Sequence, residues 1–121
     1  MERKLRVLVI DGDAVSAGSF SSALSEGGFE VVSASGCAEG LVKLDGTWCR
    51  LVLLCEALPG SGETCTRIRK LFYTPVILLG DDHSGEAWLR AVALGADAYL
   101  RKSITKQELV ARVKAILRRY H

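Results

Sequence analysis

The sequence of 121 residues has only two prolines, only two histidines and no long apolar run. No stretch approaches the roughly 18 apolar residues of a membrane-spanning helix, so no membrane association is expected. The basic start is followed by an apolar segment that stops at Asp11, which is too short for the core of a signal peptide. These absences predict a cytoplasmic protein.

Patterns for metals and disulfides are missing as well. The four cysteines include no Cys-x-x-Cys pair, and the two histidines lie far apart in the chain. In a cytoplasmic protein the cysteines are expected to be free thiols, and no metal site is predicted. The net charge of +2 gives no reason to expect nucleic acid as a partner of this domain. Length and an apolar fraction of 49% predict one globular domain over residues 1–121.

Apolar strand patterns alternate with helical patterns along the whole chain. Continuous apolar runs are typical of parallel strands covered on both faces. Strands are predicted at 5–10, 29–34, 51–55, 75–79 and 98–101. Capping residues, glycines and a proline bound helices predicted at 14–26, 37–45, 62–72, 84–94 and 106–119. Five strand–helix units with right-handed crossovers predict a single doubly wound α/β domain with a parallel sheet.

A functional site in such a sheet is expected outside the carboxyl ends of the strands. The residues that follow the predicted strands are Asp11, Gly12, Asp13, Cys55, Glu56, Ala57, Gly80, Arg101, Lys102 and Ser103. Trp48, which precedes the third predicted strand, is interpreted as a packing residue.

Five segments together resemble one protein family. They are residues 7–11, 51–60, 74–79, 94–102 and 107–119. They resemble the receiver domain of a two-component response regulator, of the class that carries a winged-helix transcription factor domain. The resemblance covers essentially the whole chain. It implies a flavodoxin-like (βα)5 fold with strand order 2-1-3-4-5 and a role in signalling, not in enzymatic turnover.

The resemblance also implies a phosphorylation site that has lost essential groups. The family uses an Asp as phosphoacceptor, two acids for Mg²⁺, a Ser or Thr and a Lys. The corresponding positions hold Cys55, Asp11 with Gly12, Gly80 and Lys102. A thiol forms no acyl phosphate and is a poor ligand for a hard cation. No phosphorylation is therefore expected, no cofactor is predicted, and Mg²⁺ should bind weakly at most.

Several neighbours of this site allow two interpretations. Asp13 reaches the pocket or, as we favour, caps the helix at 14–26. Glu56 either pairs with Lys102 or stays in solvent, and Lys102 alternatively pairs with Asp11. Tyr99 matches the family's aromatic switch position and lies either inward, above the space left by Gly80, or at the sheet edge.

Ser103 stands where the family usually has a cis proline. A trans bond with a shifted Lys102 is therefore expected.

The expected function is a pseudo-receiver that acts through protein–protein contacts, most simply as a homodimer, and regulates transcription through a domain outside this sequence. Other signalling proteins remain possible partners. Asp97, Glu108 and Arg112 match positions on the family's dimer face, and Trp88 stands in place of a basic partner for Glu108. The alternatives are a working regulator with a non-standard acceptor and a thiol redox switch at Cys55.

Overall fold

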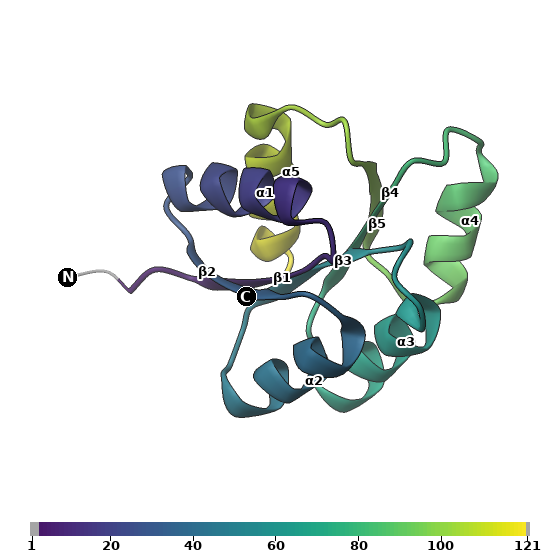
Figure 1. The fold of residues 1–121 in the computed structure, drawn as a ribbon, viewed down its shortest axis with the longest axis horizontal. Coiled ribbons are helices and arrows are strands. Elements are labelled where there is room, and N and C mark those ends of the chain that lie inside the picture. The colour runs from purple at the N-terminus through teal and green to yellow at the C-terminus, as the bar shows by residue number, and fades with distance from the viewer. Residues whose placement is uncertain (1–2, 121) are drawn as a thin grey trace.

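The computed structural model describes residues 3–120, in which five strands and five helices alternate strictly (Figure 1). The strands are β1 (Arg6–Ile10), β2 (Glu30–Ala34), β3 (Leu51–Cys55), β4 (Val76–Gly80) and β5 (Ala98–Arg101). The helices are α1 (Ala14–Glu26), α2 (Cys37–Gly46), α3 (Ser61–Leu71), α4 (Glu86–Ala93) and α5 (Lys106–Arg118). All strand pairs are parallel, in the order β2-β1-β3-β4-β5, which confirms the predicted fold.

Alternate residues of each central strand pack against opposite layers of helices, because successive side chains of a strand point to opposite faces. Val7 and Leu53 belong to the core beneath α1 and α5. Leu8 and Leu54 belong to the core on the other face, beneath α2, α3 and α4 (Figure 1). Both faces of β1, β3 and β4 are therefore buried, as their unbroken apolar sequences predicted.

Side-chain caps position two helices that border the candidate site. Asp13 accepts hydrogen bonds from the backbone N–H groups of Val15 and Ser16, at 2.9 and 3.4 Å, and so caps α1. Thr105 caps α5 by accepting from the N–H of Glu108 at 3.1 Å. The carboxylate of Glu108 lies 3.8 Å from the Arg112 guanidinium, one turn further along the same helix.

Helix α4 begins two residues later than the prediction from the sequence. Ser84 does not cap it; its backbone N–H donates to the Asp82 carboxylate at 2.8 Å. This hydrogen bond closes a turn at residues 82–84, and the helix starts after Gly85 without a side-chain cap.

Trp48 is not a packing residue, contrary to the expectation from the sequence. It lies between α2 and β3, its relative exposure is 72%, and the Arg50 guanidinium lies 5.1 Å from the centre of its ring. None of the helices in residues 3–120 has the length and apolar character that crossing a membrane requires.

Candidate functional site

The carboxyl edge of the sheet holds a buried ion pair between Asp11, after β1, and Lys102, after β5. The ammonium nitrogen of Lys102 lies 3.4 Å from each carboxylate oxygen of Asp11. The Asp11 side chain is only 1% exposed, and the carboxylate also accepts the backbone N–H of Asp13 at 3.0 Å. Such partners are what a buried carboxylate needs to remain charged.

Ser16, on the first turn of α1, completes this cluster. Its hydroxyl donates to Asp11 at 2.5 Å and accepts from Lys102 at 3.2 Å. The sequence analysis missed Ser16, although the cap at Asp13 places this turn over the end of β1. Asp13 itself serves the helix backbone and takes no part in the ion pair.

Cys55 ends β3 beside Lys102 and is 3% exposed. Burial opposes the charge of Lys102, but the neighbouring Cys55 and Asp11 outweigh it and raise the pKa of Lys102 above its ordinary value. Lys102 therefore stays charged at neutral pH and neutralises Asp11. The bond between Lys102 and Ser103 is trans, and the lysine still reaches the cluster.

The position of the second family acid, Gly12, is crowded by the loop after β3. A β-carbon at Gly12 would lie 3.1 Å from a methyl group of Leu58 and 3.2 Å from the carbonyl oxygen of Ser35. Within residues 3–120, no group of three or more His, Cys, Asp and Glu side chains is arranged to hold a metal ion. One carboxylate that already binds a lysine and a hydroxyl does not fit the oxygen-rich shell of Mg²⁺.

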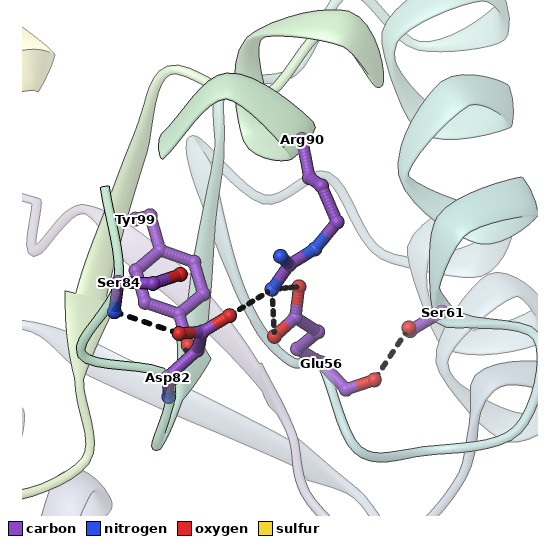
Figure 2. Close-up of polar contacts among 6 residues, drawn as sticks. All are labelled: Glu56, Ser61, Asp82, Ser84, Arg90 and Tyr99. Carbon is purple, nitrogen blue, oxygen red and sulfur yellow. Dashed lines mark hydrogen bonds and ion pairs between the residues drawn. The ribbon is translucent and has the colours of Figure 1, made fainter. Parts of the chain in front are cut away.

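A second ion cluster at the carboxyl edge joins three segments (Figure 2). Arg90 of α4 contacts both carboxylate oxygens of Glu56, after β3, at 3.3 and 3.2 Å, and Asp82, after β4, at 2.8 Å. Glu56 therefore pairs with Arg90 and not with Lys102. Hydrogen bonds from Ser84, and then from Arg90, lower the pKa of Asp82 to about 2.

Tyr99 of β5 points inward and lies beside this second cluster (Figure 2). Its hydroxyl accepts the backbone N–H of Asp82 at 3.0 Å. A β-carbon at Gly80 would overlap the Tyr99 hydroxyl and come within 3.0 Å of the Glu56 carboxylate. The tyrosine thus occupies space that only glycine at position 80 leaves free.

The residues expected on a dimer face differ in their exposure and in their intramolecular partners. Trp88 is 59% exposed on α4 and lines an open groove of about 440 Å³ with Glu108 and Arg112 of α5. Glu108 and Arg112 pair within their own helix. Asp97 is only 13% exposed, because it binds Arg69 and accepts hydrogen bonds from Val76 and Tyr120 of its own chain. It offers no free charge to a partner.

Comparison with known proteins identifies the family. The family described as response regulator receiver domain matches residues 7–114, so the chain belongs to it. The chain is 36% identical over an alignment of 116 residues to a CpxR homolog, a transcriptional regulatory protein of Haemophilus influenzae, and the match covers 94% of this chain and 51% of that protein. It is 31% identical to the phosphate regulon transcriptional regulatory protein PhoB of Escherichia coli, covering 94% of this chain and 52% of that protein. The chain thus spans about half the length of these relatives.

Solved structures show the same fold over nearly the whole chain. A two-component response regulator from Clostridium difficile superposes with a TM-score of 0.90 at 29% identity, covering 98% of this chain and 99% of that chain. The orphan response regulator HP1043 of Helicobacter pylori gives a TM-score of 0.84 at 26% identity, covering 93% and 96%. The architecture is flavodoxin-like, as the resemblance implied.

Proposed function

We propose that this chain is a receiver module that signals without phosphorylation at its receiver site. The observation that carries the proposal is the buried cluster of Asp11, Ser16 and Lys102, in which each charged group already has a partner inside the protein. A phosphoryl group would have to break this cluster to reach Lys102. The adjoining thiol of Cys55 provides no carboxylate to accept it.

The module acts through protein contacts, and in this proposal its interaction face is α4, β5 and α5. Trp88, Leu89 and Val92 of α4 are 59%, 60% and 52% exposed. Exposed apolar surface and aromatic side chains are enriched where proteins bind one another. Tyr99 is held inward by Asp82 without a phosphoryl group, so the face is present constitutively.

The proposed occupant of this face is a second copy of the chain, and the proposed output is regulation of transcription. The relatives with the printed names CpxR homolog and PhoB are transcriptional regulatory proteins about twice as long as this chain. In this proposal a DNA-binding part outside the 121 residues would carry out regulation, and the module would supply association rather than catalysis.

Mass spectrometry of the intact chain tests the absence of phosphorylation. The protein is incubated with acetyl phosphate and Mg²⁺, beside a receiver that retains the phosphoacceptor Asp. The second protein should gain a phosphate-sized increment and this chain should gain none. An increment on this chain would overturn the proposal, and its location at Cys55 by peptide mapping would support a non-standard acceptor instead.

A further inference from the structure

The amino edge of the sheet, opposite the candidate site, is strongly basic. Two grooves of about 560 and 530 Å³ open there and share residues 3–5. We call this surface the basic edge; the cationic residues that line it are Arg3, Lys4, Arg6, Arg50, Lys114 and Arg118. Of the described residues that line the two grooves, only Glu30 is acidic, and Arg6 pairs with it at 3.1 Å.

Helix dipoles do not explain this concentration of charge. Basic residues in the last turn of a helix are favoured by its dipole, which accounts for Arg118 of α5. Arg3 and Lys4, however, precede β1, Arg6 begins it, and Arg50 lies in the bend before β3. Their positive charge is therefore an independent feature of this edge.

The small net charge of the whole chain does not reveal the basic edge, because acidic and basic residues are concentrated at opposite edges of the sheet. Carboxylates such as Asp11, Glu56 and Asp82 lie at the carboxyl edge, and each has an intramolecular cationic partner. Among the described residues, Lys4, Arg50 and Lys114 of the basic edge have no carboxylate within ion-pair distance. The expectation that nucleic acid is excluded rested on net charge, which averages over these two edges.

An exposed aromatic ring also lies at the basic edge, and the density of cations around it decides which partner fits. Trp48 lines one of the two grooves, is 72% exposed, and carries the Arg50 guanidinium over its ring at 5.1 Å. Clustered cations on one face are typical of surfaces that bind nucleic acids. A DNA duplex carries about one phosphate charge per 1.7 Å of its axis, a denser line of charge than the side chains of an extended acidic peptide, which are spaced by about 3.3 Å per residue.

We propose that the basic edge binds the phosphate backbone of double-stranded DNA. The inference builds on the proposed role in transcription, because it supplies contacts that hold the regulator on DNA without reading its sequence. Lys114 and Arg118 of α5 lie on the same groove as Arg3 and Lys4, so whatever follows α5 in a longer chain would leave from this edge.

Fluorescence anisotropy with a short labelled duplex and the 121-residue chain tests this inference. Binding should weaken steeply with salt, with a slope of log K against log salt of about −4.5 if roughly five phosphates are neutralised. The double variant Lys4→Gln with Lys114→Gln should reduce the steepness of that slope by about 2. Both side chains are exposed, so the fold should tolerate the change.

The matched control is Arg67→Gln with Lys106→Gln, which removes the same charge from exposed positions that do not line the two grooves. The control should keep the salt dependence of the unmodified chain. An equal loss of DNA affinity in both variants, or no DNA binding at low salt, would overturn the inference. So would tighter binding of a polyglutamate peptide than of the duplex, since the partner would then be an acidic protein. Phosphorylation and self-association are measured without DNA, so failure here is distinguishable from failure of the proposed function.

Discussion

At the scale of single residues, Gly80 and Tyr99 depend on each other. A serine at position 80 would place its β-carbon on the Tyr99 hydroxyl, so the ring would have to turn outward and release the backbone N–H of Asp82. We expect Gly80→Ser to cost about 1 kcal/mol of unfolding free energy, the net value of a typical hydrogen bond. NMR should show shifts for Tyr99 and Asp82, and urea unfolding gives the stability.

Gly85→Ser is the control for this substitution, because a β-carbon at Gly85 meets no atom within 4 Å. That variant should leave the resonances of the Tyr99 ring in place. A Tyr99 ring that stays put in Gly80→Ser would contradict the idea that glycine is what admits it.

The lowered pKa of Asp82 predicts how the stability of the folded chain depends on pH. Its pKa is about 2 in the folded chain and 3.8 ordinarily, and the hydrogen bond from the backbone of Ser84 is the largest cause. A depressed pKa contributes stability that is present above about pH 4 and is lost as the pH falls toward 2. NMR titration of the Asp82 carboxyl carbon should give a midpoint near 2. Arg90→Leu should raise that midpoint only in part, and a full return to 3.8 would show that Arg90 is the main cause.

The sequence could suggest a pair of interacting residues only where the fold brings both of them to the same edge of the sheet. Asp11 and Lys102 follow β1 and β5, whose carboxyl ends lie at the same sheet edge with β3 and β4 between them. The fold therefore allows their pairing, which is one of the two interpretations that the sequence supports. Arg90 lies on the exposed side of a helix, and nothing in the sequence assigned it to Glu56, 34 positions earlier. Ser16 was missed for a related reason, since a serine in a first helical turn is also a common surface residue.

At the scale of elements, α4 is weakly anchored by its own packing. It has eight residues, no side-chain N-cap, and only Ala87 and Ala91 buried. Arg90 adds ion pairs to the loops after β3 and β4 (Figure 2). The position of α4 therefore depends strongly on the Arg90 guanidinium, whereas the longer helices rely more on their own packing.

Hydrogen exchange of Arg90→Gln tests this anchoring. Exposed ion pairs contribute about 0–1 kcal/mol each, so protection of the α4 amides should fall roughly two- to fivefold. The other helices should keep their protection. The control is Arg67→Gln on α3, a residue for which the described chain has no ion pair. Unchanged exchange in α4 would mean that packing alone holds the helix.

Elements with strong internal signals were predicted most closely. Strands β3 and β5 and helix α1 have the predicted bounds, because apolar runs or caps end abruptly at both sides. The start of α4 was misplaced because Ser84 and Asp82 are both good turn formers, and the sequence does not rank them. In a sequence, an aromatic residue next to a buried strand looks like a core residue. Trp48 was misassigned for this reason, because only the structure shows that the preceding turn exposes its side chain.

At the scale of the whole molecule, the proposed dimer depends on apolar area rather than on charge. Asp97 is neutralised inside its own chain, and Glu108 pairs with Arg112 along α5. The two acids that match the family's dimer face are thus already paired within the chain, so salt should act little through them. Trp88 remains exposed, and covering on the order of 100 Å² of it would contribute about 2–3 kcal/mol from each protomer at ~25 cal/mol per Å².

We therefore expect a symmetric dimer at micromolar concentration whose dissociation constant rises at least tenfold in Trp88→Ala, a change of about 1.4 kcal/mol or more, and changes little with salt. Trp48→Ala is the matched control, because Trp48 is an equally large and similarly exposed side chain on a different part of the surface. Sedimentation equilibrium of the three proteins at low and high salt separates the effects. A monomeric unmodified chain contradicts the dimer itself. If both substitutions weaken the dimer equally, the interface lies elsewhere. If salt alone dissociates the dimer, association depends on charge and not on Trp88.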